Sequence, residues 1–204
     1  MSSEAAVPRR RAARLAPAER RAAIRRAARA TALADGLGAV TLRAVAAKAG
    51  VAPALVAHYA PSMEELVAET FAAIVREELD EMAALVDDRE PRAALVELIQ
   101  TLLAGTRDDV TAVWVEAWAL GRRSEPLAAA VRDEMDAWAR LLAGIVEAGV
   151  RAGVFRVDDP AAAAWQLLGM IDGLNAQALV RWGEASERSA LMLRAAEGML
   201  GGAR

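Results

Sequence analysis

Residues 41–66 constrain the fold more than any other part of this chain. They read TLRAVAAKAGVAPALVAHYAPSMEEL, two short helical segments joined by a tight turn and followed by the start of a third. Thr41 is a favourable N-cap for the first segment, and Gly50 can adopt the positive φ that ends it. Pro53 suits the first turn of the second segment, which we expect to end near Tyr59. This pattern predicts a helix-turn-helix, in which the second helix is offered to the DNA major groove.

Helical signals continue on both sides of this motif. One helix is expected from Pro17 to Gly36, and Ser62 with Glu65 forms a capping-box pattern for a long helix that ends near Asp87. Beyond it, capping residues and apolar periodicity predict helices near 91–104, 110–120, 124–152, 160–182 and 186–200. No strand is expected, and the alanine- and leucine-rich composition indicates an all-α fold.

Charge is divided unevenly along the chain. Residues 1–60 hold eleven lysines and arginines against three acidic residues, a formal charge of +8, whereas residues 61–204 carry a formal charge of −11. A basic N-terminal segment followed by an acidic remainder is expected of a phosphate-binding module joined to a domain that does not contact DNA. Arginines dispersed over solvated helix faces are the alternative. The arginines of the N-terminal arm could follow a minor groove or phosphates, or could simply keep the chain soluble: Arg9, Arg10, Arg11 and Arg14.

Composition argues against several classes of function. The chain has no cysteine, which excludes disulfides, thiolate catalysis and cysteine-ligated zinc. His58 is the sole histidine and lacks the partner cluster of a metal site or a general base. We therefore expect no catalytic residue, no metal, no cofactor and no enzyme activity. Because no apolar run approaches the roughly 18 residues of a membrane helix and the N-terminus lacks a signal-peptide core, we expect a cytoplasmic protein with no membrane partner.

The motif and its neighbours resemble the DNA-binding segment of TetR-type transcriptional regulators, over about Arg20 to Val67. The positions that carry the resemblance are Ala27, Ala28, Leu33, Asp35, Gly36, Thr41, Arg43, Ala46, Ala49, Gly50, Val51, Pro53, Val56, His58, Tyr59, Ser62, Glu65 and Leu66. In the second half, VWVEAW at 113–118, AGVF at 152–155 and IDGL at 171–174 resemble the choline/betaine-responsive repressor type.

This resemblance implies a homodimeric transcriptional repressor that a small-molecule effector releases from a palindromic operator. It also implies a division of the chain into a disordered basic arm, a helix-turn-helix DNA-binding domain, and a domain for ligand binding and dimerisation. We place these at 1–16, 17–62 and 63–204.

The resemblance further implies which side chains contact double-stranded DNA. Arg43 falls where some relatives read a guanine, and among the base-facing positions it alone can make a bidentate contact. Base contacts are also implied for Pro53, Ala54 and Ala57, and phosphate contacts for Thr41, His58 and Tyr59. A plain surface role is the alternative for Arg43 and for His58.

The chain departs from the family pattern at Ala52, Ala54, Ala57, Ala60 and Met63. The second helix of the motif thereby loses its side-chain N-cap, the core beneath it loses an aromatic ring, and one phosphate-binding lysine is missing. Specificity is then expected to depend on Arg43 and on DNA shape. A TetR-like interaction or ligand-binding module with weak or lost DNA binding is the alternative function.

All five tryptophans lie in residues 114–182. Trp114 and Trp118 are i,i+4 neighbours, and Trp165, Asp172 and Asn175 share one face of the helix expected at 160–182. A buried carboxylate without a partner is costly. Two interpretations follow. In the first, these five residues from the two helices line a ligand cavity. In the second, neighbouring helices or a dimer partner satisfy the polar groups of Asp172 and Asn175. An acidic cavity that contains tryptophan suits a cationic effector.

Overall fold

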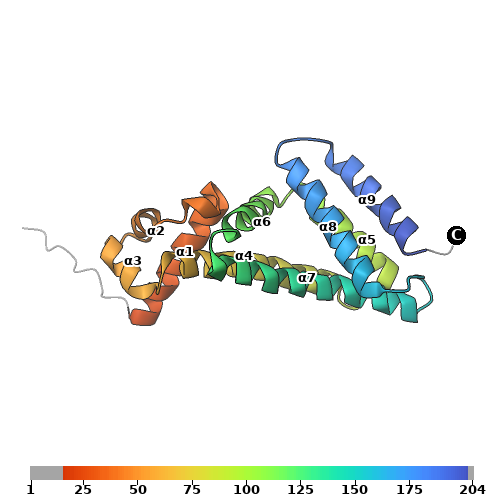
Figure 1. The fold of residues 1–204 in the computed structure, drawn as a ribbon, viewed down its shortest axis with the longest axis horizontal. Helices are drawn as coiled ribbons and strands as arrows, with labels where there is room; N and C mark the ends of the chain where they lie inside the picture. The colour runs from red at the N-terminus through yellow and green to blue at the C-terminus, as the bar shows by residue number, and fades with distance from the viewer. Residues whose placement is uncertain (1–15, 202–204) are drawn as a thin grey trace, which may run out of the picture.

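The computed structural model describes residues 16–201, and within that range it is all-α with no strand (Figure 1). The predicted fold class is confirmed. Residues 1–15 and 202–204 lie outside the described residues, and with them lies almost all of the predicted arm. The elements are α1 (Pro17–Asp35), the 3₁₀ turn η1 (Leu37–Ala39), α2 (Leu42–Ala49), α3 (Pro53–Tyr59), α4 (Met63–Val86), α5 (Pro91–Leu102), α6 (Asp108–Gly121), α7 (Glu125–Arg151), α8 (Pro160–Ala178) and α9 (Ala185–Met199).

Side-chain caps define the starts of three helices, α2, α4 and α8. The Thr41 hydroxyl accepts a hydrogen bond from the Ala44 N–H at 3.3 Å, and the Ser62 hydroxyl accepts one from the Glu65 N–H at 3.0 Å. The Asp159 carboxylate does the same for α8. By contrast, the N-cap residue of α3 is Ala52, which offers no side-chain hydrogen bond, as the sequence predicted. Such a cap contributes about 1 kcal/mol, so α3 depends more than α2 on packing for its stability.

The C-terminal end of α8 corrects the prediction from sequence. The helix was expected to reach Trp182, but it ends at Ala178 and the chain turns through Arg181, which has a positive φ of 59°. Trp182 and Val180 are 65% and 78% exposed. Their apolar side chains extend the helical spacing in the sequence without reaching a core, which explains why periodicity alone placed the end of the helix too late.

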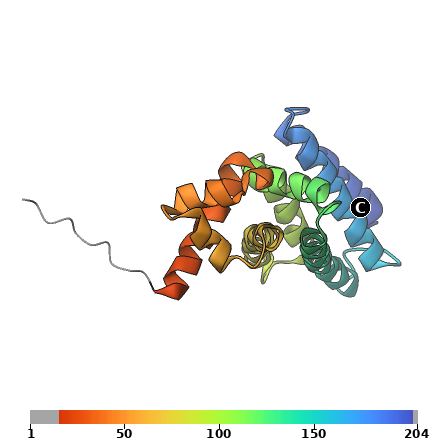
Figure 2. The same cartoon turned by 60° about the vertical axis from the view of Figure 1, so that its left-hand side comes forward.

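The helices form a head, a shaft made of α4 and α7, and an opposite end (Figure 1). The head consists of α1, α2 and α3, and α4 runs from it along α7 toward the other end of the molecule, where α5, α8 and α9 pack together. Turning the molecule shows α4 and α7 nearly end-on, with α6 packed across them (Figure 2). This arrangement makes α4 and α6 the physical connections between the two ends.

Two hydrophobic clusters stabilise this arrangement. The first joins the head to the shaft, with Leu37, Phe71, Val113 and Leu127 among its buried members. The second fills the far end between α5, α7, α8 and α9, and the Trp114 side chain packs against both. The first cluster therefore extends well past the domain boundary that we predicted between residues 62 and 63.

Candidate functional site

The predicted DNA-contacting residues lie on neighbouring helices of the head. Tyr59 is half-buried. The other members of the set are exposed, and they are Thr41, Arg43, Pro53, Ala54, Ala57 and His58. They belong to α2 and α3 or to the caps of these helices, which pack against each other at the end of the molecule remote from α9 (Figure 1). The fold thus presents the predicted set to solvent from one pair of helices.

Aromatic contacts fix the C-terminal end of α3. The rings of His58 and Tyr59 meet edge to face, with 5.1 Å between their centroids. The guanidinium carbon of Arg21 on α1 lies 5.9 Å from the centre of the Tyr59 ring, within the range of a cation–π contact. Tyr59, the last residue of α3, is therefore held against α1. The positive charge of Arg21 beside its ring suits a phosphate neighbour.

Two of the departures from the family pattern have visible packing consequences. Ala60 is buried, so the position of the missing aromatic ring is filled by a methyl group at the edge of the first cluster. Met63 is half-buried and packs against the same cluster. Its side chain thus contributes to the core as well as marking the start of α4.

A cavity of about 40 Å³ lies among α4, α5, α6, α7 and α8. The predicted residues Trp114, Asp172 and Asn175 line it. The remaining lining residues were not predicted from the sequence, and they are Glu78, Leu102, Arg107, Thr111, Met135, Trp138, Leu168 and Ile171.

Two residues predicted to line this cavity lie outside it, which corrects the prediction from sequence. Trp165 is 70% exposed, because the buried side of α8 is centred on Ala164, Leu167 and Ile171 and Trp165 falls on its outer edge. Trp118 packs against the first cluster, one turn of α6 closer to the head than Trp114. Side chains at i,i+4 share a helix face, but the cavity is too short to receive both.

Asp172 has an unusual electrostatic environment for a carboxylate. Its removal from water raises its pKa to about 6, and no opposing charge offsets this effect. Within residues 16–201, it forms no salt bridge with an arginine or lysine. A desolvated carboxylate without a cationic partner favours a cation that enters the cavity.

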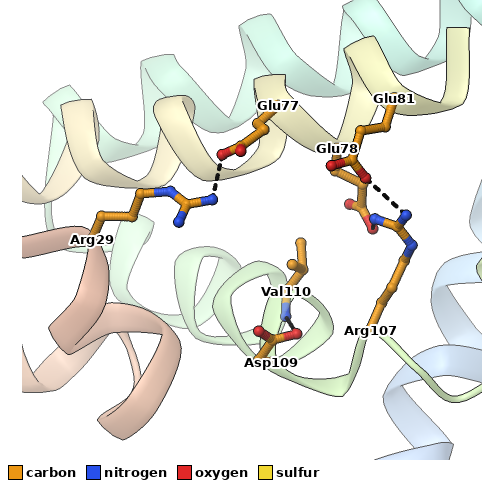
Figure 3. A network of polar contacts seen from close by, with 7 residues as sticks. All are labelled: Arg29, Glu77, Glu78, Glu81, Arg107, Asp109 and Val110. Carbon is orange, nitrogen blue, oxygen red and sulfur yellow. Dashed lines mark hydrogen bonds and ion pairs between the residues drawn. The ribbon is translucent and has the colours of Figure 1, made fainter. Parts of the chain in front are cut away.

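The second carboxylate in the cavity already has a partner. Burial raises the pKa of Glu78 to about 7, although the neighbouring guanidinium of Arg107 works in the opposite direction. Arg107 lies 3.7 Å from Glu78 and 2.8 Å from Glu81, so it bridges two carboxylates of α4 (Figure 3). The positive charge at this wall is thereby largely engaged.

A sequence signal for Glu78 existed. Ile74, Glu78 and Met82 follow one another at four-residue spacing along α4, and all three are buried. A carboxylate in the middle of an apolar stripe indicates a polar site within the core, since burying such a group is costly.

Helix α6 connects this cavity to the head. Thr111 and Trp114 line the cavity, whereas Glu116, half a turn farther along α6, accepts a hydrogen bond from the Gly38 backbone N–H. Trp114 also meets Phe71 of α4 edge to face at 4.9 Å. Arg29 of α1 also pairs with Glu77 of α4 (Figure 3). Both α4 and α6 therefore connect the wall of the cavity to the head.

Other kinds of site receive no support within residues 16–201. No group of three or more His, Cys, Asp or Glu side chains in that range is arranged to hold a metal ion. No helix there has the length and apolar character needed to cross a membrane.

Comparisons with known proteins agree with the geometry. Residues 24–70 match the family described as bacterial regulatory proteins of the tetR family, and residues 91–200 match the BetI-type transcriptional repressor C-terminal domain. The HTH-type transcriptional regulator BetI of Rhizobium meliloti (strain 1021) is 32% identical over 143 residues, which cover 69% of this chain and 68% of that protein.

Solved structures share the fold. A transcriptional regulator from Saccharomonospora viridis in complex with choline superposes with a TM-score of 0.76 and 24% identity, covering 86% of this chain and 94% of that one. A transcriptional regulator from Pseudomonas aeruginosa PAO1 superposes with a TM-score of 0.78 and 20% identity, covering 93% and 94%.

Proposed function

This chain belongs to the TetR family of bacterial regulatory proteins and carries a BetI-type C-terminal domain, and on that premise we propose that it is a repressor released from DNA by a small organic cation. The observation that carries the effector class is the Asp172 carboxylate, which lines the cavity with no cationic partner among the described residues. A ligand cation would replace the hydration that this group has lost.

The aromatic lining favours the same ligand class. Trp114 and Trp138 both line the cavity, and tryptophan is the aromatic residue that attracts a cation most strongly. The regulator from Saccharomonospora viridis, which shares the fold, was solved with choline bound. Choline is therefore the first ligand to test on this protein, and we do not restrict the effector to it.

On the DNA side, we propose that the exposed residues of α2 and α3 form the contact surface. Arg43 would read a base edge, because a guanidinium can donate two parallel hydrogen bonds to guanine. Pro53, Ala54 and Ala57 would approach thymine methyl groups, and Thr41, His58 and Tyr59 would contact phosphates. The small apolar side chains of α3 carry little hydrogen-bond information, which leaves much of the discrimination to Arg43 and to DNA shape.

A C2-symmetric homodimer would read two half-sites of a pseudo-palindromic operator. The dimer surface that we propose is the outer face of α8 with its neighbour α9. Trp165, Met170 and Leu191 are exposed apolar side chains of these two helices. Gly169 and Gly173 lie on the same outer side of α8, and a Cβ placed on either glycine would meet no atom within 4 Å. Glycine inside a helix costs about 1 kcal/mol relative to alanine, and close approach of a second subunit's backbone would compensate.

Release would follow from the small size of the cavity. A volume of about 40 Å³ leaves little room for a choline-sized cation, and its entry would widen the space between the surrounding helices. Because α4 and α6 form part of that wall and contact the head, the ligand would prefer one head position over another. This difference in affinity is what shifts a regulator between states.

The test is a DNA-binding titration with the segment that flanks the protein's own gene, with and without choline. The proposed function predicts a specific complex in the absence of choline and weaker binding in its presence. If no specific complex forms with this or any genomic fragment while choline still binds, the protein is instead a ligand-binding module that has lost DNA recognition. If DNA binds and no small cation changes it, the proposed effector class is wrong.

A further inference from the structure

Arg76 of α4 and Glu134 of α7 form an ion pair whose carboxylate is buried. The Glu134 side chain is 2% exposed, and both of its oxygens accept hydrogen bonds from Arg76: Nε donates to Oε2 at 3.0 Å, and Nη2 donates to Oε1. Within residues 16–201, no other salt bridge joins α4 to α7. Two parallel hydrogen bonds fix the orientation of the groups as well as their separation, so this pair holds the two helices in one register.

The ion pair lies beside two walls of the cavity. On α4, Arg76 precedes the cavity-lining Glu78 by two residues. On α7, Glu134 directly precedes Met135 and lies one helical turn before Trp138, and both of these line the cavity. The walls that α4 and α7 contribute are therefore joined at the place where a ligand would have to part them.

Breaking this ion pair would leave Glu134 as a buried carboxylate without a partner. Removing one partner of a buried ion pair typically shifts the folding equilibrium by a factor of about 100 or more. An effector typically changes the affinity of a regulator by only about 5- to 150-fold. Parting α4 from α7 therefore requires more free energy than an effector usually supplies.

Helix α6 is held differently. Within the described part of the chain, no side-chain hydrogen bond or salt bridge joins α6 to α7. Its Glu116 side chain instead accepts a hydrogen bond from Gly38 in the head. The remaining walls, α5 and α8, belong to the end of the molecule opposite the head (Figure 1). Thus α6 is the wall that reaches the head without being fastened to α7.

We propose that Arg76 and Glu134 are positioning residues: they hold α4 and α7 together as one unit, so that a ligand displaces α6 and acts on the head through Glu116 and Gly38. In this arrangement α4 is a fixed support and does not tilt against α7. The Arg29–Glu77 pair, one residue along α4 from Arg76, attaches α1 to that support and gives the head a point about which it can turn (Figure 3). This inference rests on the proposed function and specifies how release occurs.

The ion pair itself is tested by urea unfolding, without any ligand. Arg76→Met leaves Glu134 buried and unpaired, and it should lower the folding equilibrium constant about 100-fold or more. Arg76→Met combined with Glu134→Leu removes both charges, and its equilibrium constant should return to within about tenfold of wild type. Wild-type stability of the single variant would overturn the inference, because α4 could then leave α7 at little cost.

The folded double variant tests the positioning role. The readout is the ratio of the affinities for operator DNA without and with saturating choline. This ratio should fall by a factor of about 2 to 10, because α4 can now yield to the ligand and α6 moves less. Arg89→Met combined with Glu97→Leu is the control, since it removes an Arg–Glu pair outside the cavity and should preserve the wild-type ratio.

The outcomes separate this inference from the function on which it rests. An unchanged ratio in the folded double variant gives the ion pair a purely structural role, which overturns the inference and leaves a cation-released repressor intact. A larger ratio also overturns it, since the ion pair would then restrain an α4 that moves. If choline does not alter operator binding by the wild-type protein, the proposed effector class fails and the inference fails with it.

Discussion

The Glu116 side chain accepts a hydrogen bond from the backbone N–H of Gly38, with 2.9 Å between Oε2 and the nitrogen. The same carboxylate lies against Gly36, where an added Cβ would collide with Oε1. Gly36 has φ 88° and ψ 163°, a conformation that is essentially restricted to glycine. One side chain of the cavity-lining helix α6 is thus joined to the segment that links α1 to α2.

Replacing Glu116 with alanine should weaken the communication between ligand and DNA. The variant loses the hydrogen bond that joins α6 to the head, so the change in DNA affinity caused by saturating choline should shrink by a factor of about 2 to 10. Affinity for choline itself should change little, because Glu116 does not line the cavity. Glu116→Gln keeps an acceptor oxygen and should behave nearly as wild type. Unaltered coupling in the alanine variant would place the transmission elsewhere, with α4 as the alternative.

Replacing Asp172 with asparagine should weaken cation binding while stabilising the fold at neutral pH. Burial raises the pKa of this carboxyl from 3.8 to about 6, so the folded protein binds the proton more tightly than the unfolded chain does. Between pH 3.8 and about 6 stability therefore falls as pH rises, and above that range the ionised group destabilises the fold. Asparagine removes the cost, so urea unfolding at pH 7.5 should give the variant the larger free energy of unfolding, with the difference shrinking at pH 5.

The same titration predicts how ligand binding depends on pH. Choline affinity of the wild-type protein should drop as pH falls through about 6, because protonation neutralises Asp172. Glu78 also lines the cavity, beside Arg107, and burial raises its pKa to about 7, so a second transition is expected above the first. Asp172→Asn should abolish the lower transition only, and Glu78→Gln the upper one only. A wild-type affinity that stays constant between pH 5 and pH 8 would exclude both carboxylates from the site.

Replacing Arg43 with alanine should cost on the order of 1–3 kcal/mol of specific DNA binding and relax the preference at one base pair in each half-site. The loss of paired hydrogen bonds to a guanine explains both effects. Binding to the operator and to unrelated DNA is measured by fluorescence anisotropy at several salt concentrations. Equal weakening on all sequences, with a shallower salt dependence, would show instead that Arg43 contacts a phosphate.

Replacing Met63 with lysine should strengthen binding to DNA of every sequence. A new phosphate contact at the start of α4 would steepen the slope of log affinity against log salt by about 1. Because Met63 packs against the first cluster, stability depends on whether the lysine stem covers the same apolar surface while its ammonium reaches solvent. Met63→Gln is a control without the charge. DNA affinity that is unchanged at low salt would show that this helix start does not approach the backbone.

Replacing Trp165 with glutamate should weaken the homodimer. This side chain is 70% exposed on the proposed dimer face, and a charge buried between two subunits carries a large desolvation cost. Light scattering at micromolar concentration should show a dimer for the wild-type protein and a larger monomer fraction for the variant. Val180→Glu changes an equally exposed apolar residue in the turn after α8 and should leave the dimer intact. A wild-type monomer would contradict the proposed assembly itself.

The sequence predicted the elements well, because the signals for them are local. Helix starts at Thr41, Ser62 and Asp159 follow from a side-chain oxygen that caps nearby backbone N–H groups, and Gly50 ends α2 in the left-handed conformation. The largest error, at the end of α8, arose where apolar residues continued the helical spacing without a core to receive them. The 3₁₀ turn at 37–39 was not predicted.

The candidate cavity could be predicted only in part. Trp114, Asp172 and Asn175 line it, as expected, because an acid among aromatics on a helix face is visible in the sequence. The helical period left the position of Trp165 undecided, since a residue at the edge of an amphipathic face can point inward or outward.

By itself, then, the sequence determined the all-α fold, the helix-turn-helix, and the presence of costly polar groups in the second half, because each depends on residues within a few positions of one another. Only the tertiary structure decided which polar groups share one cavity. Glu78, Trp138 and Asp172 come from α4, α7 and α8, and helix packing leaves the Asp172 carboxylate there without a salt-bridge partner among the described residues. That packing depends on contacts between segments far apart in the chain, which no local periodicity records.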